Sequence, residues 1–404
     1  MKHYFFSELV KIKKSINLLQ DDPDNIDCFV SIQNELLLWH EWLEQSVRKR
    51  KKRLIELKQL KRSRTNTKNM SIAFKNSIKI CKRQIEELSD LKLWSRHIGN
   101  SLPHIYYDKY DLRPYAYSLD KQELKELSGD ILGKEGQDFE KSCFDLAISK
   151  GIKALMNDLT SIMRHGDLTL MDKDIPYLME LKQSEACKKK GEKQLKSMKA
   201  VQEYIITDES ESLRGGNYLS KRIAMNNDEI TRIDEFNKHL ELTKVNGHHF
   251  SAIEEGVYCY SFYSGTPPEK LREHMSFIDG LKQPMFISLN ELKNNLDLSL
   301  FYPYSLSLKD PEVFASFISG YLSIYLFIDW EHLSSIAREL NVDIKLESDD
   351  YCLSLTSGNC STVKSFTLTK ALVEFSSLGW AVREACNLYH QTLDLYNHQV
   401  KEKI

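Results

Sequence analysis

Residues 158–204 decide the fold of this chain and read DLTSIMRHGDLTLMDKDIPYLMELKQSEACKKKGEKQLKSMKAVQEY. Apolar and polar residues alternate through residues 166–170, which is typical of a half-buried strand. Residues 171–174 form a polar turn, and residues 175–182 read as a second strand. The stretch therefore predicts a β-hairpin.

This hairpin gathers charged side chains. Side chains alternate in direction along a strand, so Glu180 and Lys182 share one face of the second strand. Asp167 lies on the first strand, near them across the hairpin. Two carboxylates and an ammonium are costly to half-bury unless something binds there. A hard divalent cation, which prefers oxygen ligands, is the candidate.

Asp167, a turn and then Glu180-Leu181-Lys182 resemble the signature of the restriction-endonuclease-like superfamily, the PD-(D/E)XK nucleases. Gly166 stands where many members have a proline before the aspartate, a departure that the family tolerates. The resemblance covers residues ~130–240 and leaves the rest of the chain outside it.

Two flanking helices strengthen the resemblance. Residues from 136 onward open an amphipathic segment that looks like the family's first core helix, whose glutamate, here Glu140, often faces the metal. Residues 185–205 read as a basic helix that carries Gln194, where many members place a Gln or Lys next to the site.

The resemblance implies metal-assisted hydrolysis of phosphodiester bonds in DNA, with RNA not excluded. Asp167 and Glu180 would bind Mg²⁺ or Mn²⁺, and Glu140 would help to hold a metal. Lys182 would orient the attacking water and offset charge in the transition state. Gln194 and the lysines of the same helix would contact phosphates, Lys188, Lys189 and Lys190 among them.

A structural role explains the same hairpin residues. Glu180 and Lys182 can form an ordinary ion pair on a solvated face, with Asp167 as an acid near the turn. The chain would then be a catalytically inactive nuclease-like scaffold, and its helical arm would mediate assembly.

A third alternative rests on the C-terminal region. Arg383 and His390 lie seven residues apart on an expected helix, a spacing found in some HEPN-type ribonucleases. Arg232 and His239 have the same spacing, so chance readily produces it.

Composition limits the class of protein. The 404 residues, 28% charged and 41% apolar, suit two or three domains of an ordinary soluble protein. Residues 1–240 carry a net charge of +6 and residues 241–404 a net charge of −8, which indicates separate tasks. The sequence has no run of 18 apolar residues, no signal peptide and no C-x-x-C pair among its eight cysteines. These features predict a cytoplasmic protein without a membrane partner.

We expect a mixed α+β fold with four regions. They are a helical hairpin or coiled-coil arm (1–98), a linker or docking segment (99–134), a nuclease-like α/β core (135–240) and a C-terminal α+β domain (241–404). The last region should contain strands at 258–262, 285–287 and 351–355, and helices at 311–327, 331–340 and 369–399. The coiled coil would join copies of the chain or a partner protein.

The middle of the arm is strongly basic. Residues 48–64 hold ten Lys or Arg against one acid, and we call the first six of them the basic stripe: Arg48, Lys49, Arg50, Lys51, Lys52 and Arg53. Such a stripe can follow a phosphate backbone, although a solvated helix face is the ordinary alternative. A nuclease core between two unfamiliar modules resembles prokaryotic restriction or anti-phage defence effectors.

Overall fold

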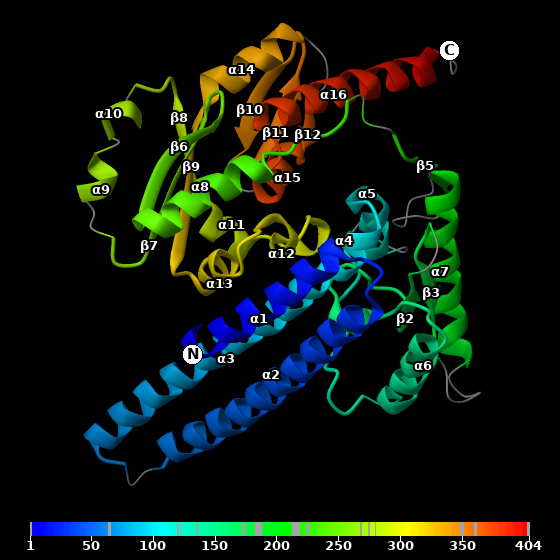
Figure 1. The fold of residues 1–404 in the computed structure, drawn as a ribbon, viewed down its shortest axis with the longest axis vertical. Helices are drawn as coiled ribbons and strands as arrows, with labels where there is room; N and C mark the ends of the chain where they lie inside the picture. Colours follow the sequence, from blue (N-terminus) through cyan, green and yellow to red (C-terminus); the bar gives the residue numbers. More distant parts are fainter. Residues whose placement is uncertain are drawn as a thin grey trace. The chain divides into compact units, whose positions relative to one another are not determined.

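The computed structural model describes residues 2–401 except 64–65, 119–120, 122, 135, 172–173, 182–187, 212–218, 224, 226, 267–268, 274, 279, 348–350 and 359–361. The chain divides into two compact units: Ser15–Arg222, here the hairpin unit, and Met1–Lys14 with Ile223–Ile404, here the sheet unit. Both combine helices with small antiparallel sheets, so the fold is mixed α+β, as the sequence predicts (Figure 1). The boundary predicted at residue 240 falls inside helix α8 (Ile233–Asn246), and the chain divides instead after Arg222.

Helix α1 (Lys2–Asp21) is shared between the units, because its residues up to Lys14 belong to the sheet unit. Phe5, Leu9 and Ile12 recur at helical spacing and are buried. The helix ends just before Pro23, which cannot donate a backbone hydrogen bond.

The predicted pair of long helices is confirmed by α2 (Ile26–Lys61) and α3 (Lys68–Gly99), which lie side by side (Figure 1). The Asn25 side chain accepts a hydrogen bond from the Cys28 amide and begins α2, and Thr67 does the same for Met70 and begins α3. Buried apolar residues of both helices line their contact, among them Leu36, Leu43, Leu57, Cys81 and Leu88.

The segment predicted as a linker folds into short helices, α4 (Ser101–Tyr106), α5 (Lys109–Leu112) and the 3₁₀ helix η1 (Arg113–Ala116). The Tyr115 ring is fully buried and its hydroxyl donates to the carbonyl of Pro176. The segment is therefore part of the hairpin unit's core, which agrees with a docking role better than with a free linker.

The next elements build a small sheet between two helices. They are α6 (Gln137–Ser149), β1 (Ala154–Met156), η2 (Asn157–Leu159), β2 (Leu168–Leu170), β3 (Tyr177–Met179) and α7 (Lys188–Thr207), followed by β4 (Glu209–Ser210) and β5 (Ser220–Lys221). The order β1-β2-β3 is antiparallel throughout, and Leu168 pairs with Met179. The predicted hairpin is thus confirmed as β2–β3, with shorter strands than expected. Phe144 of α6 packs against Ala154 and Leu168.

The sheet unit contains a four-stranded antiparallel sheet of order β6-β7-β9-β8 and a three-stranded sheet of order β10-β11-β12. The strands are β6 (His248–Glu254), β7 (Val257–Tyr263), β8 (Pro284–Ser288), β9 (Leu322–Asp329), β10 (Asp343–Glu347), β11 (Cys352–Thr356) and β12 (Val363–Ser365). The remaining helices are α9 (Glu269–Arg272), α10 (Met275–Ile278), α11 (Leu289–Asn295), η5 (Leu298–Leu300), α12 (Tyr304–Ser307), α13 (Pro311–Ser319), α14 (Trp330–Glu339), α15 (Thr367–Glu374) and α16 (Leu378–Lys401). Within the part of the chain that is described, no helix is long and apolar enough to cross a membrane.

The three strands expected in this region are confirmed as β7, β8 and β11. The helix expected at 311–327 is wrong in its second half. Gly320 adopts a φ of +77° and ends α13, and the chain then continues as β9, the strand between β7 and β8.

Candidate functional site

Acidic residues meet at one end of the three-stranded sheet. Asp158 follows β1, Asp167 directly precedes β2 and Glu180 directly follows β3. Neighbouring strands run antiparallel, so these three positions lie at the same end of the sheet. Glu140 comes from the first turn of α6, which packs against β1. We call these four carboxylates the acidic site.

Gly166 and the strand ends fix Asp167. Gly166 has a φ of +76°, a left-handed conformation that glycine adopts readily. The Asp167 amide donates to the carbonyl of Met179 at 2.8 Å. One oxygen of its carboxylate, Oδ2, accepts from the Leu181 amide at 2.7 Å. The second oxygen, Oδ1, is turned toward Lys134.

The ammonium of Lys134 lies among three of the carboxylates. Its Nζ is 2.9 Å from Glu140 Oε1, 3.0 Å from Asp158 Oδ2 and 3.6 Å from Asp167 Oδ1. Burial lowers the pKa of this ammonium, but Asp158 and Glu140 outweigh burial, so the pKa is raised. Lys134 is therefore charged at neutral pH.

Glu140 responds in the opposite direction to the usual paired carboxylate. Burial raises its pKa, and the nearby charges of Asp167 and Asp158 raise it further, although Lys134 lowers it; the net effect is an increase. A single ammonium thus does not compensate the acids around it.

Lys125 is a second cation of the site. Its ammonium donates to the carbonyl of Arg164. Burial lowers its pKa, while Glu180 and Asp167 both act on it to raise the pKa, and the net effect is a decrease. Because both motif carboxylates act on one ammonium, Asp167 and Glu180 lie in one electrostatic neighbourhood.

His165 completes the neighbourhood. The side chain is buried, and its Nε2 donates to the carbonyl of Tyr117 at 2.9 Å. Burial lowers its pKa to about 4, and Lys125 and Arg164 contribute in the same direction. The imidazole is therefore neutral at physiological pH.

The other predicted site residues are placed less fully. Lys182 lies outside the described residues. Gln194 is exposed on α7. Lys188, Lys189 and Lys190 form the start of α7, and their side chains lie outside the described part of the structure.

The donor set suits a hard cation, but its spacing suits an ammonium. Among the described residues, no three His, Cys, Asp or Glu side chains are already arranged as a metal shell. The carboxylate oxygens around Lys134 lie 2.9 to 3.6 Å from Nζ. Mg²⁺ takes oxygens at about 2.0–2.1 Å and Ca²⁺ at about 2.3–2.6 Å. The carboxylates would have to close by roughly 1 Å to hold such an ion.

Half of the basic stripe is engaged within the protein. Arg48 donates to Asp130 and to the carbonyl of Leu132, Arg50 donates to Gln84, and Arg53 pairs with Glu56. The other three members are exposed on α2, namely Lys49, Lys51 and Lys52. These three lysines are the exposed part of the predicted phosphate-binding surface.

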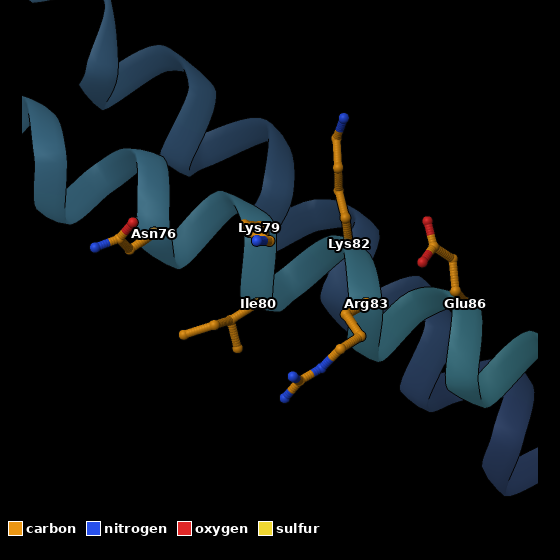
Figure 2. A pocket seen from close by; sticks show the side chains of 6 residues that line it. All are labelled: Asn76, Lys79, Ile80, Lys82, Arg83 and Glu86. Carbon is orange, nitrogen blue, oxygen red and sulfur yellow. The ribbon is translucent and has the colours of Figure 1, made fainter.

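A cavity of about 650 Å³ lies against α3 and is lined by Asn76, Lys79, Ile80, Lys82, Arg83 and Glu86 (Figure 2). All of its lining residues come from one helix. The side chains of Lys82 and Arg83 point in opposite directions in Figure 2, so no set of polar groups converges on a substrate. The cavity adds positive charge to the hairpin but no catalytic arrangement.

The Arg and His pairs at helical spacing have structural partners. Nε2 of His390 donates to the carbonyl of Leu340, whereas Arg383 is exposed. His239 is buried between the hydroxyls of Ser251 and Ser261, and burial lowers its pKa to about 3.

Sequence reasoning missed Lys134, Asp158 and Lys125, since each is an isolated charge without a characteristic spacing. Only the fold brings them beside Asp167. Comparison of the chain with protein-family models, curated proteins and solved structures finds no match.

Proposed function

We propose that the chain is a metal-dependent endonuclease that hydrolyses the phosphodiester bonds of DNA. One observation carries the proposal: Asp167, Glu180 and Glu140 gather at the same end of a small sheet, between helices α6 and α7. This order of helix, strands and helix supports the resemblance to PD-(D/E)XK nucleases, in which the same residue types hold the metal.

The residues have distinct roles in this proposal. Asp167, Glu180 and Glu140 would hold Mg²⁺ or Mn²⁺, an ion that polarises a scissile phosphate and lowers the pKa of a bound water. The Leu181 amide holds one oxygen of Asp167 and so leaves the other directed into the acidic site. Lys182 would orient the water and offset developing negative charge.

The basic surface of the hairpin unit would bind the nucleic acid. Lys49, Lys51 and Lys52 are exposed and would contact phosphates in a manner independent of sequence. A role in restriction or anti-phage defence is a hypothesis from the combination of modules alone.

Cleavage assays on plasmid, linear duplex and single-stranded RNA, each with Mg²⁺ or Mn²⁺, test the proposal. We expect wild type to cut DNA and Asp167→Asn to be inactive, while its DNA affinity in Ca²⁺ stays near that of wild type. Asp145→Asn is the matched control, because Asp145 is an exposed acid on the same helix as Glu140 and pairs only with Lys141 among the described contacts. A folded wild type that cuts none of these substrates with either ion rejects the proposal.

One observation favours a second candidate, an inactive nuclease-like scaffold. Lys134 already pairs with three carboxylates, which can hold α6 to the sheet without a metal. In that case Asp167→Asn would lower thermal stability, and no metal would support cleavage by wild type.

A further inference from the structure

We propose that the Lys134 ammonium occupies the position that a divalent cation takes in the acidic site, and that Asp158 is one of the carboxylates that receive this cation. The inference rests on the proposed function, because it concerns the same metal site. It adds a ligand that the sequence motif does not contain and a residue that competes with the metal.

The first support is the geometry around Lys134. One ammonium contacts oxygens of Glu140, Asp158 and Asp167 within 3.6 Å, and its position is therefore the point where these three carboxylates converge. Their side chains are 14 to 18% exposed, so water screens them only partly.

The second support is the balance of charge. Three carboxylates and one ammonium leave two negative charges, apart from Glu180 and Lys125 nearby. A divalent ion in place of the monovalent ammonium compensates more of this charge. Its smaller oxygen distances would also draw the carboxylates together.

The third support concerns Asp158. Its backbone carbonyl accepts from Nε of Arg96 at 3.1 Å, which ties this residue to α3. Its carboxylate reaches Lys134 from the end of β1, beside the start of β2 where Asp167 lies. A fixed backbone and a carboxylate turned to the common point are what a metal ligand requires.

The fourth support is the separate attachment of the lysine. The amides of Ile131 and Leu132 donate to the two oxygens of the buried Glu44 carboxylate, at 2.9 and 2.8 Å. These bonds hold the segment before Lys134 to α2 without involving the lysine side chain. The 30% exposed side chain can therefore turn toward solvent while its backbone stays in place.

Calorimetric titration of the full chain with Mn²⁺ and with Ca²⁺, without nucleic acid, tests the inference. We expect Lys134→Met to bind the cation at least about tenfold more tightly than wild type, a factor that corresponds to roughly 1.4 kcal/mol. Lys134→Arg, which keeps the charge, should stay near wild type, and Asp158→Asn should bind more weakly. Lys141→Met is the matched control, since Lys141 is a lysine of α6 that pairs with Asp145 outside the acidic site.

A purely structural lysine predicts a different pattern. Its removal would lower thermal stability without any gain in cation affinity, and Lys134→Gln provides a second uncharged variant if Lys134→Met does not fold. Equal or weaker cation binding by the folded uncharged variants overturns the role of Lys134, and unchanged binding by Asp158→Asn overturns its role as a ligand. If these results accompany DNA cleavage by wild type, the nuclease proposal stands; if no variant binds a cation and wild type cuts nothing, both proposals fail.

Discussion

The guanidinium of Arg48 donates a hydrogen bond to the carboxylate of Asp130 at 3.2 Å, between residues 82 positions apart in the sequence. A second hydrogen bond joins Arg48 to the carbonyl of Leu132 at 2.7 Å. The first member of the basic stripe therefore anchors the segment that leads to Lys134. A run of six basic residues thus contains both internal anchors and exposed cations.

This division predicts how the stripe contributes to DNA binding. Replacing Lys49, Lys51 and Lys52 together with Gln should flatten the dependence of log affinity on log salt by about 0.9 for each phosphate that the variant no longer neutralises. Arg48→Gln should leave the slope near that of wild type and lower the melting temperature. Fluorescence anisotropy of a labelled duplex between about 50 and 200 mM salt measures the slope. An unchanged slope in the triple variant would assign these lysines to a solvated face.

Gly166 should be sensitive to a single added methyl group. A Cβ on Gly166 would lie 2.7 Å from the carbonyl oxygen of Met179, and this oxygen belongs to the backbone that positions Asp167. Gly166→Ala should therefore lower both thermal stability and activity. Gly151→Ala is the matched control, because Gly151 has a similar φ of +75° but open space around its Cβ position. The control should show only the strain of a left-handed residue, about 1–2 kcal/mol. Equal losses in the two variants would contradict the close approach.

His165 should make the hairpin unit less stable in mild acid. The imidazole titrates near 6.5 in an unfolded chain, but its pKa in the folded protein is about 4. Between these values the unfolded state binds a proton that the folded state does not. The free energy of unfolding should therefore fall by about 3 kcal/mol as the pH drops from about 6.5 to about 4. His165→Gln should flatten urea-unfolding profiles in this window, and parallel profiles for the two proteins would exclude the effect.

Lys182 separates the enzyme from the scaffold. As a catalytic lysine it acts mainly in the transition state, so Lys182→Ala should abolish cleavage while folding and DNA affinity in Ca²⁺ stay nearly intact. As a structural partner of Glu180, its loss would instead lower thermal stability. Melting, binding and plasmid cleavage of the same preparations measure all three properties. Lys150→Ala, at the C-terminal end of α6, controls for the loss of one positive charge. A variant that keeps full activity would remove Lys182 from the mechanism.

The sequence reveals those elements whose pattern is local. Alternation around Leu168 and Leu178 predicts the β2–β3 hairpin, and the long heptad-like spacing predicts α2 and α3. Strand β1 has only three residues and exists through its pairing with β2, so no periodicity marks it. β9 reads as an apolar run because it is a central strand, and such a run is not distinguishable from a buried helix by pattern.

The site follows the same rule. Asp167 and Glu180 are recognisable because a hairpin joins them within a few residues. Lys134 and Asp158 are separated by 24 residues and meet only after α6 has packed on the sheet. A lone charge in a loop carries no spacing from which its partner can be inferred.

The membership of α1 in both units affects the order in which the chain can fold during synthesis. Phe5, Leu9 and Ile12 leave the ribosome first, but the sheet unit to which they belong is completed only by residues after Ile223. During translation of the intervening 208 residues of the hairpin unit, this apolar helix face has no native partner from the sheet unit. A fragment that begins at Ile223 would lack the same helix. Restoring residues 1–14 as a separate peptide, or by circular permutation, is therefore the way to obtain the sheet unit complete.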